Sequence, residues 1–485
     1  MSIGRNTNYN LVGAAIPIVL ALVTVPLYLR LIGDDRYGVL SIAWLFLGYF
    51  GLFDLGLGRA TTYHISALRD GSSAERADVF WSAIMVNIVM GLVGAAILWP
   101  SAGYFFAHVF KVDEALRPEI MASVPLLAAS VPIATMTGVL TGTLMGRDRF
   151  LEVNILSVTS TALFQIFPLT VAWLIGPDIW GLLAAALAAR AVAILFMWVR
   201  CHQLVLRGER MRFDTRRARE LLAYGGWVTL TAIFGPALVI VDRFAIGAIL
   251  GATAVTVYTV PFQLAQRIAI LPNALVSAIF PRLPTAAPEE QARISSTALL
   301  SLLSVLGPPI MVALFLLHPF LDLWIGPKLG APAAAVGGII ILGFWINAFA
   351  VIPYSRLQGT GRPDLVTKLL LAQIPVYLVA LYFGMKQFGL IGCAVVFTIR
   401  CAADFILMSI AAAGRLENQR LIVANAALLT VGVFATALLS YHQPAWWVAA
   451  VVLTAAISLL GWRTMPAELH ARIAALRRFV PGSAV

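Results

Sequence analysis

The sequence has little charge and few cysteines. Only 12% of its 485 residues are charged, whereas 60% are hydrophobic and the mean hydropathy is +0.90. Soluble domains carry charge on roughly a quarter of their residues, so this composition indicates an integral membrane protein. The three cysteines, Cys201, Cys393 and Cys401, are too few and too scattered for a disulfide framework or a metal-ligand cluster. We therefore expect no metal site.

A nucleotide-binding motif is also lacking. The chain has no G-x-x-x-x-G-K-[ST] loop, and no polar segment is long enough to form a nucleotide-binding domain. This excludes ATP-driven pumping by the chain alone, and nothing else in the sequence calls for a cofactor.

Long apolar stretches are abundant. A helix of about 20 residues, rising 1.5 Å per residue, crosses the roughly 30 Å hydrocarbon layer of a membrane. Fourteen stretches meet this length, at residues 9–31, 38–63, 80–99, 121–144, 151–175, 180–199, 221–246, 254–280, 295–317, 333–357, 365–384, 389–412, 421–440 and 446–462. The predicted fold class is an all-α integral membrane protein with 14 transmembrane helices.

Basic residues are distributed unevenly among the predicted loops. With the N-terminus placed in the cytoplasm, 24 of the 34 lysines and arginines fall on the cytoplasmic side, six fall outside and four lie within spans. Cytoplasmic loops of membrane proteins carry such an excess. The bias predicts that both termini are cytoplasmic. It also accounts for the net charge of +11 without a nucleic-acid partner.

Similar segments recur 210 to 218 residues apart. The matched pairs are Leu31–Leu40 with Ile249–Tyr258, Gly146-Arg147 with Gly361-Arg362, and Arg190 with Arg400. An offset of six spans predicts two six-helix lobes in parallel orientation, followed by two appended helices. Bundles built from repeats are typical of alternating-access transporters.

The repeat gives the expected domain organisation. The four parts are an N-terminal lobe at 1–200, a basic cytoplasmic linker at 201–220, a C-terminal lobe at 221–414, and two appended helices with a cytoplasmic tail at 415–485.

Three arginines are predicted to lie near the membrane midplane: Arg190, Arg267 and Arg400. A charge there costs at least ~2.5 kcal/mol on insertion scales, so each arginine needs a partner or a wet cavity. Guanidinium is a permanent, planar donor that suits phosphate oxygens. The three arginines are therefore candidate binding residues for an anionic substrate.

Span 254–280 carries a polar stripe. On an ideal helix its polar residues fall within an arc of roughly 120°, whereas the opposite face is apolar. The stripe consists of Thr256, Thr259, Gln263, Gln266, Arg267, Asn273 and Ser277. We expect it to line a water-filled cavity, which adds Thr259, Gln263 and Gln266 to the candidate substrate-binding residues.

Arg400 and Asp404 are spaced i, i+4 in span 389–412. This spacing allows an ion pair within the helix. Two interpretations stay open at this point: a self-neutralising structural pair, and a site at Asp404 for a coupling ion.

The segment Pro26–Ala60, which contains the motif Asp54–Arg59 (DLGLGR), resembles the opening of Wzx-type polysaccharide flippases. These belong to the superfamily of MATE exporters and the lipid II flippase. Val241–Leu264 resembles the second lobe of that family. The resemblance covers nearly the whole chain.

This resemblance implies a V-shaped pair of six-helix lobes. They would move an undecaprenyl-diphosphate-linked oligosaccharide from the inner to the outer leaflet of a bacterial cytoplasmic membrane. The expected partners are this polyprenyl-diphosphate-linked oligosaccharide, the lipid bilayer, and a polysaccharide polymerase with its export machinery. The three midplane arginines fit the cationic central cavity expected of such flippases.

Two other classes of membrane protein would need different residues. A cation-coupled small-molecule exporter should present acidic and aromatic groups in its cavity, but the midplane arginines outnumber the one midplane acid, Asp404. A membrane enzyme should carry catalytic residues in a sizeable outer loop. The longest outer loop, Pro100–Ile120, is more typical of an interfacial segment than of an active site. The sequence favours a flippase over both.

Overall fold

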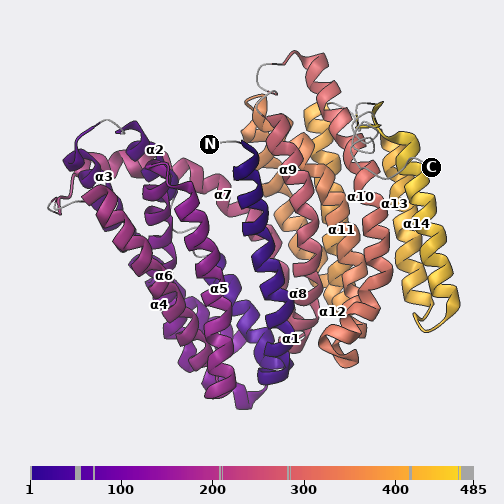
Figure 1. The fold of residues 1–485 in the computed structure, drawn as a ribbon. Coiled ribbons are helices and arrows are strands. Elements are labelled where there is room, and N and C mark those ends of the chain that lie inside the picture. The colour runs from indigo at the N-terminus through magenta and orange to yellow at the C-terminus, as the bar shows by residue number, and fades with distance from the viewer. Residues whose placement is uncertain are drawn as a thin grey trace, which may run out of the picture. The chain divides into compact units, whose positions relative to one another are not determined.

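The chain folds almost entirely into helices. The computed structural model describes residues 3–49, 56–68, 71–206, 209, 211–280, 283, 286–413, 418–467 and 469–470. These residues form fourteen α-helices with short 3-10 and π-helical segments, and they contain no β-strand (Figure 1). Eleven helical stretches in the described part are long and apolar enough to cross a membrane. The predicted all-α membrane fold is confirmed.

By their internal contacts the helices form two compact units, Met1–Thr256 and Val257–Val485, so the boundary falls within α8. The first unit contains α1 (Ile3–Tyr49), α2 (Leu57–Ala67), α3 (Ser73–Tyr104), η2 (Phe105–Val109), η3 (Glu114–Leu116), α4 (Arg117–Gly146), α5 (Phe150–Leu174), α6 (Ile179–Cys201), η4 (His202–Leu206) and α7 (Thr215–Ile249). Contacts group α7 with the helices before it. The division at 201–220 predicted from the repeat stays a prediction.

The second unit begins within α8 (Ala252–Ala265). It continues through η5 (Gln266–Ala269), α9 (Ile270–Ile279), α10 (Pro288–Ile325), α11 (Pro327–Gly359), α12 (Pro363–Ala413), α13 (Gln419–Leu438) and α14 (Pro444–Thr464). Helices α13 and α14, the pair at the yellow end of Figure 1, pack against α10. Glycines make that contact close: a Cβ on Gly432 would lie 2.7 Å from the sulfur of Met311.

Two long helices join predicted spans. Helix α12 contains the spans 365–384 and 389–412, whereas α1 contains the span 9–31 and the first part of 38–63, whose end lies on α2. Helix α1 bends at Gly33, with φ of 81°, and α12 bends at Gly389, with φ of 58°. Glycine adopts positive φ without the penalty that a Cβ brings. The loops expected between these predicted spans are therefore sharp bends at a glycine within otherwise continuous helix.

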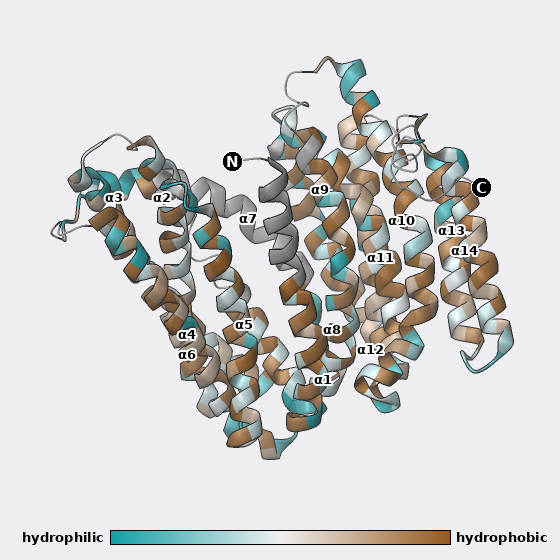
Figure 2. Ribbon diagram, in the orientation of Figure 1, coloured by the Kyte–Doolittle hydropathy of each residue, from teal (hydrophilic) through white to brown (hydrophobic). Residues whose placement is uncertain are grey.

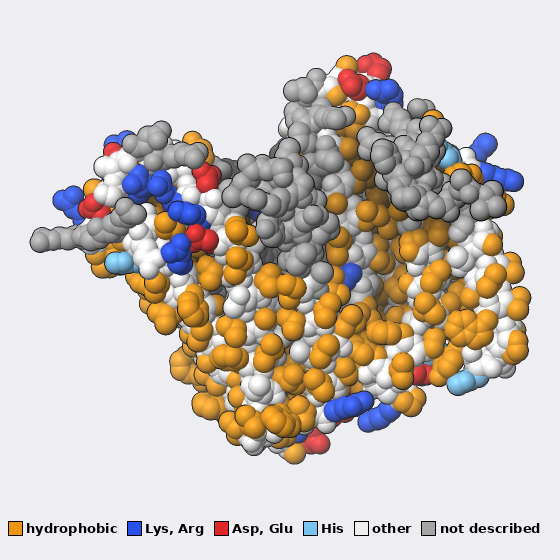
Figure 3. Space-filling model, in the orientation of Figure 1, with side chains coloured by type: hydrophobic (Ala, Val, Ile, Leu, Met, Phe, Trp, Pro, Cys, Tyr) orange, Lys and Arg blue, Asp and Glu red, His pale blue; other side chains and the backbone are white. Residues whose placement is uncertain are grey.

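Both units present apolar surface along the length of their helices. Brown segments in Figure 2 occupy the middle of the helices and teal segments their ends. On the face drawn in Figure 3, hydrophobic side chains form a broad zone, and charged side chains gather near the helix ends. Such an arrangement suits a lipid environment, because the hydrocarbon layer excludes charge.

The turns after α4 and α11 repeat each other. The amide of Arg149 donates to the carbonyl of Leu144 at 3.0 Å, and the amide of Arg362 donates to the carbonyl of Leu357 at 2.9 Å. Both turns thus end a helix with the same backbone hydrogen bond. The same bond ends α5 and α7, where the amides of Gly176 and Gly251 donate to the carbonyls of Val171 and Ile246, so the internal repeat stays a prediction.

Aligning the two turns by their backbone geometry pairs different residues from those paired by the sequence match. The residues with positive φ in the two turns are Asp148, at 59°, and Gly361, at 76°. Their offset is 213 residues, which matches Gly146 with Gly359. The predicted match of Gly146 with Gly361 was based on residue identity and stays a prediction.

The other matched segments, Leu31–Leu40 and Ile249–Tyr258, contact each other within the first unit. The Thr256 hydroxyl donates to the carbonyl of Asp34 at 2.7 Å. The Thr253 hydroxyl donates to the carboxylate of Asp35. The first turn of α8 is thereby tied to the bend of α1.

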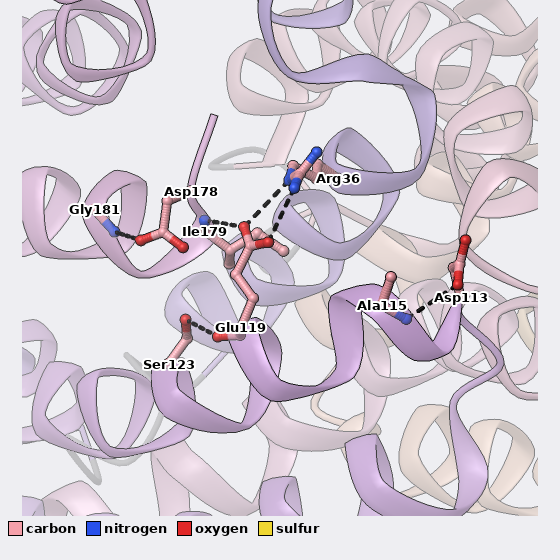
Figure 4. Close-up of polar contacts among 8 residues, drawn as sticks. All are labelled: Arg36, Asp113, Ala115, Glu119, Ser123, Asp178, Ile179 and Gly181. Carbon is pink, nitrogen blue, oxygen red and sulfur yellow. Dashed lines mark hydrogen bonds and ion pairs between the residues drawn. The ribbon is translucent and has the colours of Figure 1, made fainter. Parts of the chain in front are cut away.

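Polar clusters lie at opposite ends of α4, α5 and α6. At one end Glu119 accepts hydrogen bonds from Arg36 at 3.2 and 3.1 Å and from the amide of Ile179 at 2.5 Å (Figure 4). At the other end Glu152 accepts two from Arg200, at 2.9 and 3.0 Å. Loops predicted on one side of the membrane thus meet at one end of the unit.

Candidate functional site

Arg190 lies in the middle of α6 among alanines that let neighbouring helices approach closely. Its guanidinium carbon lies 4.8 Å from the ring centre of Phe164 on α5. Among the described residues, none forms a hydrogen bond or an ion pair with Arg190. The guanidinium thus has an aromatic neighbour and unused donors.

A cavity of about 400 Å³ lies beside Arg190 within the first unit. Its walls come from α1, α4, α5 and α6. They consist of Leu47, Ala134, Thr137, Ser157, Ser160, Thr161, Phe164, Arg190, Ala193, Ile194 and Met197. The volume lies within the roughly 300–1,000 Å³ range of small-molecule sites. The cavity therefore offers one cation and several hydroxyl groups in an apolar frame.

The hydroxyls are concentrated on one face of α5. Ser157, Ser160 and Thr161 follow the i, i+3, i+4 spacing of a helix face, and Phe164 continues it one turn on. The Thr161 hydroxyl donates to the carbonyl of Ser157 at 2.9 Å. Within the described part of the chain, the hydroxyl of Ser160 has no hydrogen-bond partner.

Aromatic packing fixes the ring under Arg190. Phe164 lies 6.0 Å from Trp44 of α1, measured between ring centres. One residue further on, Gln165 accepts a hydrogen bond from the Thr24 hydroxyl at 2.6 Å. Helix α1 is therefore docked on α5 beside the cavity, which holds the Phe164 ring in place for the guanidinium.

Arg400 on α12 has a different environment. It is only 9% exposed, and its guanidinium lies 5.6 Å from the ring centre of Tyr377 and 5.5 Å from that of Phe397. Its Nη2 donates to the sulfur of Cys401 at 3.5 Å. Its Nε has no hydrogen-bond partner in the described residues. Arg400 is thus buried against two rings and a weak sulfur acceptor.

Asp404 has a different hydrogen-bond partner. Its carboxylate accepts a hydrogen bond from Gln373 at 3.1 Å. In the described part of the structure, Arg400 and Asp404 form no ion pair. The structural pair considered from the i, i+4 spacing is not formed, because the guanidinium packs on the rings while the carboxylate binds Gln373. Asp404 as an ion-coupling residue stays a prediction.

The polar stripe of span 254–280 is not on one regular α-helix. Gln266–Ala269 form a 3-10 turn between α8 and α9. Pro272 accounts for it: proline has no N–H for the carbonyl of Ile268 and clashes with it in an α-helix. A 3-10 helix has 3.0 residues per turn instead of 3.6. The 120° arc, calculated for ideal α-helix, was therefore wrong beyond Ala265.

The candidates on this segment differ in exposure. Thr259 is 2% exposed, and its hydroxyl has no hydrogen-bond partner among the described residues. Gln263 is half-buried, whereas Gln266 and Arg267 are exposed. Thr256 belongs to the contact with α1 described above.

The second unit brings α8 next to the Arg400 region. The ring of Phe262 on α8 lies 5.4 Å from that of Phe397, on which Arg400 packs. Two other predicted positions cannot be placed: Asp54 of the Asp54–Arg59 motif and the side chain of Ser277 lie outside the described residues. Arg59 is exposed.

The hydroxyl face of α5 was not among the predicted site residues. The signal is present in the sequence as Ser157, Thr159, Ser160 and Thr161 within five residues of an apolar span. Hydroxyls occur often in membrane helices, where they bond to their own backbone. Only the cavity distinguishes Ser157, Ser160 and Thr161 from Thr159, which does not line it.

These features define a class: an all-helical membrane protein with a polar cavity inside its first unit. The fold is similar to that of "Lipid II flippase MurJ, inward closed conformation", with a TM-score of 0.70 and 11% identity, covering 93% of this chain and 97% of that one. It is also similar to an inward-facing multidrug resistance MATE family transporter of the MOP superfamily, with a TM-score of 0.67 and 14% identity, covering 87% and 99%. At these identities the similarity shows the fold.

Residues 3–287 match the polysaccharide biosynthesis protein family, and the chain belongs to it. A Shigella flexneri protein named "Putative O-antigen transporter" is 29% identical over 412 residues, covering 84% of this chain and 97% of that protein. The resemblance to Wzx-type flippases is thereby confirmed. The chain is a multi-pass membrane transporter of the polysaccharide biosynthesis protein family, which is not a family of enzymes.

Proposed function

We propose that this protein moves an undecaprenyl-diphosphate-linked oligosaccharide by alternating access. The direction is from the cytoplasmic to the outer leaflet of the bacterial cytoplasmic membrane, with both termini in the cytoplasm. The outer-leaflet product would then pass to a polysaccharide polymerase and its export machinery. The named relative, a transporter of O-antigen, supports a cargo of this chemistry.

The observation that carries this proposal is the state of Arg190. A cation without an ion pair or hydrogen bond is costly inside a membrane protein, so a ligand that neutralises it is bound correspondingly more tightly. The diphosphate of a lipid carrier is such a ligand, and guanidinium binds phosphate oxygens through two parallel hydrogen bonds. The cavity beside Arg190 has room for a phosphate and part of a sugar.

Residues of the second unit are proposed to act on the same cargo. Arg267, Gln263, Gln266 and Thr259 are the candidates on α8 and η5. Arg267 and Gln266 are exposed, and the buried Thr259 hydroxyl lacks a partner in the described part, so these side chains have hydrogen-bonding capacity to offer. Arg400 is a weaker candidate, because it is buried against rings.

Asp404 is proposed as the site of a coupling ion. Its neighbour Gln373 is 9% exposed, and its Oε1 has no hydrogen-bond partner among the described residues. A bound cation or a proton would find oxygen ligands from both side chains. Asp404→Asn should then slow export without lowering the amount of protein in the membrane.

Export in cells tests the function. The chain is expressed in a bacterium that lacks its own O-antigen flippase but makes the matching lipid-linked oligosaccharide. We expect surface polymer to return, and the lipid-linked precursor in the inner leaflet to fall. Failure to restore polymer with any of several precursor-producing hosts, combined with resistance to small organic cations, would instead support the cation-coupled exporter.

A further inference from the structure

The cavity beside Arg190 contains more than an anion site requires. Arg190 supplies donors only, which suits phosphate oxygens because these only accept. Ser157, Ser160, Thr161 and Thr137 add hydroxyl groups from two helices. Their hydrogen bonds show which kind of group they can still bind.

Two of these hydroxyls have already used their hydrogen. The Thr161 hydroxyl donates to the carbonyl of Ser157 at 2.9 Å, and the Thr137 hydroxyl donates to the carbonyl of Ile133 at 3.3 Å. Each therefore offers the cavity oxygen lone pairs, which are acceptors. An acceptor repels a phosphate oxygen but binds an O–H or N–H group. The hydroxyls of Ser157 and Ser160 have no hydrogen-bond partner among the described residues and can both donate and accept. This mixture of acceptors and donor–acceptor groups suits a sugar, whose hydroxyls also do both.

The chemistry of the two sides differs accordingly. Arg190 suits an anion, and the hydroxyl face of α5, defined as Ser157, Ser160 and Thr161, suits a neutral polyol. In a lipid-linked oligosaccharide these two groups are adjacent, because the first sugar is bonded directly to the diphosphate. A cavity of about 400 Å³ has room for this junction and not for a whole oligosaccharide.

We propose that the hydroxyl face of α5, with Thr137, binds the sugar next to the diphosphate, while Arg190 binds the phosphate. The proposal rests on the proposed function and adds a place where one sugar is distinguished from another. A site built to hydrogen-bond a ligand discriminates against ligands that leave its groups unpaired.

The test uses the full-length protein purified into lipid nanodiscs. The probes are undecaprenyl diphosphate and the same lipid bearing one N-acetylglucosamine, N-acetylgalactosamine, glucose or galactose. We expect at least one sugar to tighten binding by roughly fivefold or more, the effect of one or two net hydrogen bonds. The triple variant Ser157→Ala, Ser160→Ala, Thr161→Val should bind undecaprenyl diphosphate within about twofold of the unmodified protein and lose the sugar preference.

Two further variants serve as controls for the triple variant. Thr159→Val changes a hydroxyl of the same helix that does not line the cavity, and it should leave the sugar preference intact. Ser160→Ala alone removes a hydroxyl without a partner in the described residues, so it should fold normally and lose part of the preference.

The outcomes separate the two proposals. If no lipid diphosphate binds, with or without sugar, the proposed function fails and the sugar site fails with it. If undecaprenyl diphosphate binds but no sugar improves its affinity, the sugar site alone is overturned. Equal loss of bare and sugar-bearing lipid in the triple variant would also overturn it, because the hydroxyls would then be phosphate ligands.

Discussion

Arg190 and Arg400 are matched by the sequence repeat, yet the protein surrounds them differently. Arg190 borders a hydroxyl-lined cavity and has one ring, Phe164, as its neighbour. Arg400 is buried between Tyr377 and Phe397. An arginine beside a cavity keeps its donors for a ligand, whereas an arginine enclosed by aromatic rings uses its charge within the fold.

The difference separates a binding residue from a packing residue. Burying the charge of an arginine in an apolar helix costs the same free energy in either role. Small neighbouring residues, which allow close helix packing, are compatible with both roles. What differs is the immediate surroundings: hydroxyls of the neighbouring helix α5 line the cavity beside Arg190, whereas Arg400 packs on two rings of its own bent helix, α12. Replacing each arginine in turn should therefore give different phenotypes.

The largest effect is expected for Arg190→Ala. Polymer export should fall by about tenfold or more, since a charge-assisted hydrogen bond contributes about 1.5–3 kcal/mol. Membrane levels should stay near normal, because the side chain has no hydrogen bond or ion pair within the described structure. Surface polymer and immunoblots measure the two quantities. As a control, Arg216→Ala removes an arginine whose side chain is 85% exposed, and it should export normally.

Arg267→Ala should have the second largest effect. This arginine is exposed on η5, so water screens its charge, and we expect a loss of export of about three- to tenfold. Arg267→Lys should restore part of the loss, because it returns the charge without the planar fork. Export equal to that of the unmodified protein would remove Arg267 from the binding residues.

Phe164→Leu should weaken export by about two- to fivefold. The substitution keeps an apolar side chain but removes the ring under Arg190, whose cation–π contact contributes about 0.5–1 kcal/mol. The loss should disappear when Arg190 is already alanine. An undiminished effect of Phe164→Leu in that background would show that the ring acts on packing and not through Arg190.

Arg400→Met is expected to have the smallest effect. Methionine has a similar length and fills the space between the rings without a buried charge, so the thermal unfolding temperature should stay level or rise. Export should stay within about twofold, because the guanidinium is enclosed by the rings of Tyr377 and Phe397 and has little surface to offer a ligand. A tenfold loss of export at normal protein level would place Arg400 with Arg190 as a substrate ligand.

Much of this fold follows from hydropathy alone. Most of each predicted span falls on helix in the described part, because a run of about 20 apolar residues satisfies its backbone only as a helix in lipid. The span 38–63 is the exception, because Gly56 within it has a φ of 67° and precedes a separate helix, α2. The bends at Gly33 and Gly389 and the 3-10 turn before Pro272 depend on local backbone geometry. Hydropathy carries no such information, so these details were not predicted.

The site was predictable only in part. Arg190 stands out as a charge in an alanine-rich span. Its partners do not, because Phe164 and the hydroxyls of α5 approach it from another helix, and helix rotation is set by packing. For the same reason the i, i+4 spacing of Arg400 and Asp404 suggested a pair, whereas Gln373 provides the partner of Asp404.

The central claim is that the Arg190 guanidinium binds the lipid diphosphate. The most direct measurement is the affinity of undecaprenyl diphosphate for the full-length protein in nanodiscs, compared among the unmodified chain, Arg190→Gln and Arg400→Gln. We expect Arg190→Gln to weaken binding by about tenfold or more and Arg400→Gln by less than about threefold. Equal affinities for the unmodified chain and Arg190→Gln would contradict the account.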